Sequence, residues 1–318
     1  MYNSVDRKHS SGRDTPELDM AQLRERLRQQ VQRRRTKGNL AILGCGYVGS
    51  ALASYWQARG HSVTGTTTRQ DRVASLSESM SRVLVVKGDD VSKVRSLVEG
   101  QDTVVVSVAP TGYQVVDEAT YAATYLETAR NLLEALEYAP TVKQLIYLSS
   151  CSVYGDRQGS WVDENSPVAP ADRRGRVLHQ TEQIVSQAAD GNRKACILRL
   201  GGIYGPGREP IGFFGGMVGM TLPGKGDRVI NWIHLDDIVG AIEFARLNEL
   251  EGTYNLVDDS QLTIEEQVSG VCRQYGLPPA KWDPSQPSPQ RKSLRVSNQK
   301  LKAAGYQLTQ PRLFAFGT

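Results

Sequence analysis

Short apolar runs alternate with segments of helical spacing along most of the chain. The run at 40–43 is followed by apolar residues at helical intervals, Val48, Leu52 and Trp56. The run at 102–108 is almost continuous in valine, which is typical of a parallel strand covered on both faces. Further predicted elements are strands at 61–68, 82–87, 142–148 and 196–200, and a long helix at 116–137. This alternation predicts an α/β fold with a doubly wound parallel sheet.

A glycine-rich turn joins the first predicted strand to the first helix. Gly44 permits a tight turn, Gly46 lets the backbone approach a pyrophosphate, and Gly49 lets the helix pack closely on the strand. The N–H groups and dipole of the helix N-terminus favour an anion there. The alternative is an ordinary glycine-rich loop, but the flanking strand and helix favour dinucleotide binding. The residues predicted to contact the cofactor here are Gly44, Gly46, Tyr47, Val48 and Gly49.

The second predicted strand ends in hydroxyl and basic residues. A fold that prefers NAD usually has Asp or Glu here, which accepts hydrogen bonds from the adenosine ribose. This chain has Thr66, Thr67, Thr68 and Arg69 instead. Arginine can bind a 2′-phosphate with two parallel charge-assisted bonds, so NADP is favoured over NAD through Thr68 and Arg69. The alternative is that Arg69 only caps a solvent-facing turn.

Loops at the carboxyl ends of the other predicted strands are expected to flank the same cofactor, because ligands of doubly wound sheets bind at that edge. Gly88-Asp89-Asp90 follows the third strand, and 109–113 follows the fourth. The fifth strand leads into 149–155. The residues assigned to the cofactor on this basis are Asp89, Ala109, Pro110 and Ser149.

Composition narrows the class of protein. The 318 residues are 39% hydrophobic and 23% charged, and no apolar run approaches the roughly 18 residues that a membrane span needs. The four cysteines lack C-x-x-C spacing, so neither a disulfide framework nor a zinc site is indicated, and we expect a cytoplasmic protein without a metal. Residues 1–37 hold ten Lys/Arg and five Asp/Glu, a net +5, which leaves about −1 of the total +4 for the rest. The rest of the chain therefore carries no nucleic-acid footprint.

The basic N-terminal extension, 1–37, is expected to be partly helical. Leu23, Leu27 and Val31 recur every four residues among arginines. Such a helix could contact an unknown partner, whether a membrane surface, an acidic protein or RNA. The simpler interpretation is a solvated, half-docked extension.

Three further motifs follow the glycine turn in order: S-S-x-x-V-Y-G at 149–155, R-x-x-x-x-Y-G-P at 199–206 and I-H-x-D-D at 233–237. Together they make the chain resemble an extended short-chain dehydrogenase/reductase of the NAD(P)-dependent epimerase/dehydratase family. The resemblance implies a Rossmann-like, NAD(P)-binding domain at 38–200. It also implies a small, discontinuous C-terminal substrate domain at 201–318, from which elements at about 229–258 return to the Rossmann domain.

In that family a Ser or Thr orients the substrate oxygen, and a Tyr-x-x-x-Lys pair moves the proton. Ser150 matches the serine, but alignment on Glu182 places Arg174 and Leu178 at the Tyr and Lys positions. A further family position, an Asn, corresponds to Thr124. Arginine does not deprotonate in proteins and leucine carries no charge. The chain thus resembles the atypical branch that lacks the pair, whose members are seldom assigned a substrate.

Two functions are compatible with these residues. One is an NADP-dependent oxidoreductase or epimerase-like enzyme acting on a small molecule. In that enzyme Ser150 contacts the substrate oxygen and either Tyr113 or Tyr154 transfers the proton, with Arg174 as the nearby cation. The alternative is a catalytically inactive NADP-binding adaptor, redox sensor or assembly factor. The sequence leaves the oligomeric state open; the helices after strands four and five form a dimer face in many relatives, so a homodimer through them is one candidate state.

Overall fold

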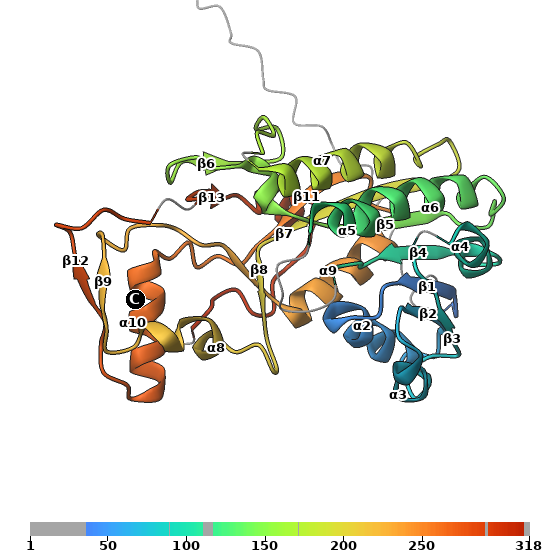
Figure 1. Cartoon of the computed structure of the whole chain (residues 1–318). Helices are drawn as coiled ribbons and strands as arrows, with labels where there is room; N and C mark the ends of the chain where they lie inside the picture. The colour runs from blue at the N-terminus through green and yellow to red at the C-terminus, as the bar shows by residue number, and fades with distance from the viewer. Residues whose placement is uncertain (1–35, 89, 111–116, 171, 290–291, 315–318) are drawn as a thin grey trace, which may run out of the picture. The chain divides into compact units, whose positions relative to one another are not determined.

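Parallel strands form the centre of the computed structural model, which describes residues 36–88, 90–110, 117–170, 172–289 and 292–314 (Figure 1). Seven strands pair in the order β11-β7-β5-β4-β1-β2-β3, and every neighbouring pair is parallel. Their bounds are β1 Asn39–Leu43, β2 Ser62–Thr67, β3 Arg82–Val85, β4 Thr103–Val106, β5 Gln144–Ser150, β7 Lys194–Leu200 and β11 Gly252–Leu256. The strand order reverses between β1 and β4, and ligands of such sheets bind at the carboxyl ends beside this reversal. The predicted doubly wound, Rossmann-like sheet is therefore confirmed.

Helices cover both faces of this sheet, and each face has its own core. Side chains alternate across a strand, so Leu40 and Ile42 of β1 pack on one side and Ala41 and Leu43 on the other. The first side is covered by α2 Tyr47–Gln57 and α9 Leu235–Leu247, with α3 Val73–Ser77 at its edge. The second side is covered by α4 Val91–Val98, α6 Thr128–Leu136 and α7 Arg173–Ser186. None of the described helices is long and apolar enough to cross a membrane.

Three small parallel sheets and three further helices lie outside the large sheet and the helices that cover it. The strand pairs are β8 Gly202–Tyr204 with β10 Trp232–His234, β9 Thr221–Pro223 with β12 Lys281–Asp283, and β6 Trp161–Val162 with β13 Arg295–Val296. The helices are α8 Pro210–Phe214, α10 Ile264–Tyr275 and α11 Gln299–Ala303. A separate core joins β8, β10, α8 and α10 around Tyr204, Phe214 and Trp232. The predicted boundary near residue 201 stays a prediction.

The predicted helix at 116–137 is interrupted. It consists of α5 Glu118–Ala122, a π-helical section Ala123–Glu127, and then α6. Thr128 Oγ1 donates to Ala123 O, five residues earlier, at 3.4 Å. A Cβ on Gly88 would lie 1.8 Å from that same Oγ1, so the helix packs where Gly88 leaves room. The apolar periodicity of 116–137 gives no sign of this contact, because Gly88 lies in a loop far away in the sequence.

Predicted strand bounds also shift. The third and fourth strands are shorter than predicted, and β5 runs from Gln144 to Ser150 rather than over 142–148. Val142 N donates to Ala139 O at 3.1 Å in a turn, and Val142 O accepts from Arg193 Nε at 3.2 Å. Both backbone groups of Val142 are thus used before the strand begins. The basic extension is outside the described residues, apart from its last two, and all four cysteines are buried and free.

Asp237 in the first turn of α9 anchors the chain end that follows α11. Its carboxylate is fully buried and accepts from Thr309 N at 2.6 Å, from Gln310 N at 2.8 Å and from Tyr306 Oη at 3.1 Å. Because a buried carboxylate needs several donors, these bonds fix the segment at 306–310 on α9.

We expect Asp237→Ala to lower the free energy of unfolding by about 3–5 kcal/mol, because it leaves buried N–H groups without acceptors. The matched control is Asp236→Ala in the same helical turn, whose side chain is 65% exposed. It should change the free energy by less than about 1 kcal/mol. Urea unfolding followed by circular dichroism measures both, and equal losses in the two variants would contradict the anchoring role.

Candidate functional site

The glycine turn after β1 is held against β2 and leaves open space in front of α2. Gly44 N donates to Thr66 Oγ1 and Cys45 N donates to Thr66 O, both at 2.8 Å. Gly44 has φ +101°, a conformation that favours glycine. A Cβ on Gly49 would lie 2.2 Å from Gly44 O, whereas a Cβ on Gly46 would meet no heavy atom within 4 Å. The turn thus excludes side chains at the helix contact and is open at Gly46.

The N-terminus of α2 suits a pyrophosphate. Its N-cap, Gly46, supplies no side-chain cap, and its first turn contains no acidic residue. The unpaired N–H groups and the helix dipole favour a negative group there, so the residues present fit a dinucleotide. The Val48 side chain is buried in the core, and Tyr47 Oη donates to Pro206 O at 2.9 Å. Tyr47 and Val48 were predicted to contact the cofactor. Because their side chains make these other contacts, we expect them to offer the cofactor their backbone N–H groups.

Two arginines follow the end of β2, and one of them contacts the glycine turn. Arg69 is exposed and forms an ion pair with Asp71, while Thr68 is exposed beside it. Arg72 was not predicted as a site residue, yet its Nη1 donates to Cys45 O of the glycine turn at 2.8 Å. Arg72 could have been found from its spacing in the sequence. It follows Arg69 by three residues, which is one turn of the 3-10 helix Gln70–Arg72.

Two predicted site residues fall outside the described part of the chain. Asp89 and Tyr113 lie there, Tyr113 within 111–116. Ala109, which is exposed, and Pro110, which is half-buried, come directly before that segment at the carboxyl end of β4.

A buried polar network lies beneath the carboxyl end of β5. Arg199 donates to the two carboxylate oxygens of Glu182 at 3.0 and 2.7 Å, and Ser149 Oγ donates to the same carboxylate at 2.5 Å. Tyr154 lies under Arg199, with its ring centroid 4.8 Å from the guanidinium carbon. Tyr154 Oη donates to Asn255 Oδ1 at 2.8 Å, and burial raises the pKa of Tyr154 to about 12. These bonds favour structural roles for Ser149 and Tyr154 rather than the predicted cofactor and proton-transfer roles.

Ser150 differs from its neighbour in the strand. Its side chain is half-buried, and its Oγ accepts from Ser152 N at 3.1 Å at the start of the 3-10 helix Cys151–Tyr154. Because the hydroxyl accepts this bond, it keeps its own proton to donate. Ser150 can therefore donate a hydrogen bond to a substrate oxygen at the carboxyl end of β5.

A pair of tyrosines that sequence reasoning missed lies next to Arg174. The guanidinium carbon of Arg174, in the first turn of α7, is 5.4 Å from the ring centroid of Tyr121 on α5. The ring centroids of Tyr121 and Tyr125 are 4.8 Å apart. Burial raises the pKa of Tyr121, while a hydrogen-bonding interaction with Tyr125 and the charge of Arg174 act in the opposite direction. Tyr125 belongs to the π-helical section, and such sections are frequent at functional sites.

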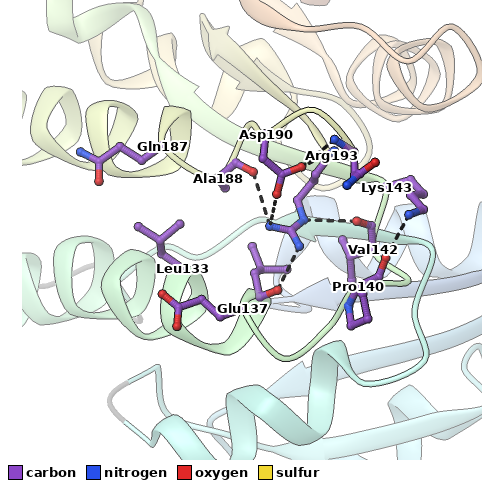
Figure 2. A pocket seen from close by; sticks show the side chains of 11 residues that line it. Leu133, Glu137, Pro140, Val142, Lys143, Gln187, Ala188, Asp190 and Arg193 are labelled. Atoms are coloured by element: carbon purple, nitrogen blue, oxygen red, sulfur yellow. Dashed lines mark hydrogen bonds and ion pairs between the residues drawn. The ribbon is translucent and has the colours of Figure 1, made fainter.

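Two hollows occur among the described residues. The first hollow, shown in Figure 2, lies at the amino ends of β5 and β7. Its volume is about 580 Å³. Arg193 lines it and donates to the backbone carbonyls of Val142, Leu136 and Ala188. The guanidinium of Arg193 therefore already has hydrogen-bond partners within the fold. The hollow lies at the amino ends of the strands, whereas a cofactor of such a sheet binds at the carboxyl ends. The other, of about 500 Å³, follows the carboxyl end of β11 and is lined by Trp161 and Asp258 among others.

Comparisons with known proteins agree with this geometry. The family model described as "NAD dependent epimerase/dehydratase family" matches residues 40–256. Protein YeeZ of Escherichia coli K12 is 35% identical over 211 residues, which cover 64% of this chain and 71% of that protein. The 3-diazoavenalumate denitrifying reductase of Streptomyces sp. is 26% identical over 278 residues, covering 82% and 88% of the two chains. The solved UDP-glucose 4-epimerase of Thermus thermophilus, in complex with NAD, has the same fold, with a TM-score of 0.70, 23% identity and coverage of 86% and 96%.

Asp258 should make the stability of the fold depend on pH. Burial raises the pKa of Asp258 from 3.8 to about 7, and Asp258 Oδ2 has no hydrogen-bond partner among the described residues. The folded protein therefore keeps a proton that the unfolded chain releases between about pH 4 and pH 7. The resulting stability is fully present below pH 4 and is lost as the pH rises through 7, at up to about 1.4 kcal/mol per pH unit.

Asp258→Asn should remove this slope and be more stable than the wild type at pH 8. At pH 4, where both side chains are neutral, the two proteins should be about equally stable. Urea unfolding at pH 4, 5, 6, 7 and 8 measures the difference, and a constant difference across this range would rule out the titration of Asp258.

Proposed function

The chain belongs to the NAD-dependent epimerase/dehydratase family, and we propose that it is an NADP(H)-dependent oxidoreductase with a non-standard active site around Ser150. The observation that carries the proposal is the open, uncapped N-terminus of α2 at the point where the strand order reverses. The reductase named among the relatives supports a redox reaction, although its substrate is not carried over.

The cofactor is proposed to lie across the carboxyl ends of the strands. Its pyrophosphate is held by the N–H groups that begin α2, and its adenosine 2′-phosphate by Thr68, Arg69 and Arg72. Arg69 must leave Asp71 to do so, whereas Arg72 already reaches the glycine turn. When bound, the cofactor supplies or accepts a hydride at its nicotinamide ring.

We infer that the proton chemistry has moved from α7 to α5. Arg174 and Leu178, four residues apart on α7, occupy the positions assigned to the family Tyr and Lys. Tyr121 is the described phenol beside Arg174, so we assign it the proton that the substrate oxygen gains on reduction. Ser150 donates a hydrogen bond to that oxygen and orients it. Tyr113 stays an alternative donor, while Tyr154 supports the site through Arg199 and Asn255.

The proposed partners are a small-molecule substrate and a second copy of the chain. The homodimer is expected to form through α6 and α7. The basic extension at 1–37 is proposed to contact another molecule or to stay solvated, and the location is proposed to be cytoplasmic.

The test of activity is NADPH oxidation with a panel of aldehydes, ketones and nucleotide sugars. Tyr121→Phe and Ser150→Ala should each lower kcat/KM by about 100-fold or more, because each removes a group that acts on the substrate oxygen. The matched control is Tyr138→Phe just after α6, an exposed tyrosine whose loss of the hydroxyl should leave turnover unchanged.

Tight NADPH binding by the wild type without turnover across the panel would contradict the enzyme and favour the non-catalytic adaptor, redox sensor or assembly factor. Full turnover in Tyr121→Phe would remove Tyr121 from proton transfer, and Tyr113→Phe would then test the alternative donor.

The preference for NADP is tested by Arg69→Asp and Arg72→Ala. Each should weaken NADPH binding relative to NADH by about 10- to 100-fold, because charge-assisted bonds to the 2′-phosphate contribute roughly 1.5–3 kcal/mol. Arg82→Ala is the control, since Arg82 is exposed and lies at the amino end of β3, away from the carboxyl ends where the cofactor is proposed to bind. Dissociation constants from isothermal titration calorimetry give the ratio, and unchanged ratios in both variants would argue for NAD.

A further inference from the structure

The loop between β8 and α8 is joined to the first turn of α2. Tyr47 Oη donates to Pro206 O at 2.9 Å. Gly205 has φ +145°, and a Cβ there would lie 3.0 Å from Tyr47 Oη. Gly205 and Arg208 exchange backbone bonds, with Arg208 N donating to Gly205 O at 2.8 Å and Gly205 N to Arg208 O at 3.2 Å. The loop therefore has a defined shape and a defined position relative to the glycine turn.

Arg208 is carried by this loop to the side of Tyr47. Its guanidinium carbon is 4.3 Å from the ring centroid of Tyr47, and its side chain is exposed. Tyr47 is the first residue of α2, so the cation is held beside the helix N-terminus. The neighbouring carboxylate, Glu209, is turned back onto the loop, where its Oε1 accepts from Gly207 N at 2.8 Å.

The glycine turn thus has a guanidinium on each of two elements that contact it. Arg72 reaches Cys45 O from the end of β2, and Arg208 reaches Tyr47 from the loop after β8. A pyrophosphate brings about two negative charges to a helix end that offers roughly half a positive charge. A guanidinium close to Tyr47 would offset more of this negative charge, and it can donate two parallel bonds to phosphate oxygens.

We propose that Arg208, positioned by its stacking on Tyr47, binds the pyrophosphate of the dinucleotide and so couples the loop after β8 to cofactor binding. This assignment rests on the cofactor site proposed above. It gives Tyr47 a positioning role through its ring and its hydroxyl, in addition to its backbone N–H.

The experiment compares three ligands that share the adenosine end. NADPH and 2′-phospho-ADP-ribose contain the pyrophosphate, whereas adenosine 2′-monophosphate does not. Dissociation constants are measured by calorimetry or ligand-observed NMR for the full-length wild type, Arg208→Ala, Arg208→Lys and Arg59→Ala. Arg59 is a matched control, because its guanidinium carbon also lies over a tyrosine of α2, 3.4 Å from the centroid of Tyr55, near the other end of the helix.

Arg208→Ala should weaken NADPH and 2′-phospho-ADP-ribose by about 10- to 100-fold and leave adenosine 2′-monophosphate unchanged. Arg208→Lys should lie in between, and Arg59→Ala should match the wild type. Wild-type affinity of Arg208→Ala for all three ligands would overturn the role of Arg208 and leave the cofactor site standing. An equal loss for adenosine 2′-monophosphate would also overturn it, because the effect would not depend on the pyrophosphate. A wild type that binds no dinucleotide would instead refute the proposed function itself.

Discussion

The ion pair between Glu182 and Arg199 fixes the part of the fold where chemistry is expected. Both side chains are buried, and removing two charges from water destabilises a fold unless each charge is well paired. Ser149 adds a third bond to the carboxylate, and the ring of Tyr154 lies against the guanidinium. Ser149 and Tyr154 are thus committed to the pair. Because successive side chains of a strand point to opposite faces, Ser150 is the serine of β5 left to contact a ligand.

The same pair joins α7 to β7 and thereby sets where the first turn of α7 lies. Arg174 belongs to that turn, four residues before Leu178, which is buried in the cluster of Cys151 and Tyr154. Arg173 forms an ion pair with Glu118 and so connects α7 to α5. The position of Arg174 relative to Tyr121 is therefore a consequence of helix packing that the buried pair stabilises.

Local patterns predicted the parts of the fold that neighbours in sequence determine. The glycine turn and β1 need only the residues around Gly44, and the burial of β4 on both faces is visible in its valines. The π-helical section was missed by local periodicity, and Thr128, which follows it directly, packs on Gly88, about 40 residues earlier in the sequence. Arg72 and Arg208 were missed for the same reason, since their partners at the glycine turn lie 27 and 161 residues away in sequence.

In the proposed site the proton source lies on α5, and an arginine at the position assigned to the family tyrosine keeps a positive charge beside it. The arginine at 174 cannot give up a proton near neutral pH, but it can stabilise the phenolate of a tyrosine beside it. Tyr121 has that neighbour: burial raises the pKa of Tyr121, and the hydrogen-bonding interaction with Tyr125 and the charge of Arg174 partly offset this rise. In the family arrangement the cation and the phenol share one helix, whereas in the proposed site they lie on α7 and α5. The proposed site therefore depends on the packing of two helices, which makes it more sensitive to mutations at their contact than a pair on one helical face.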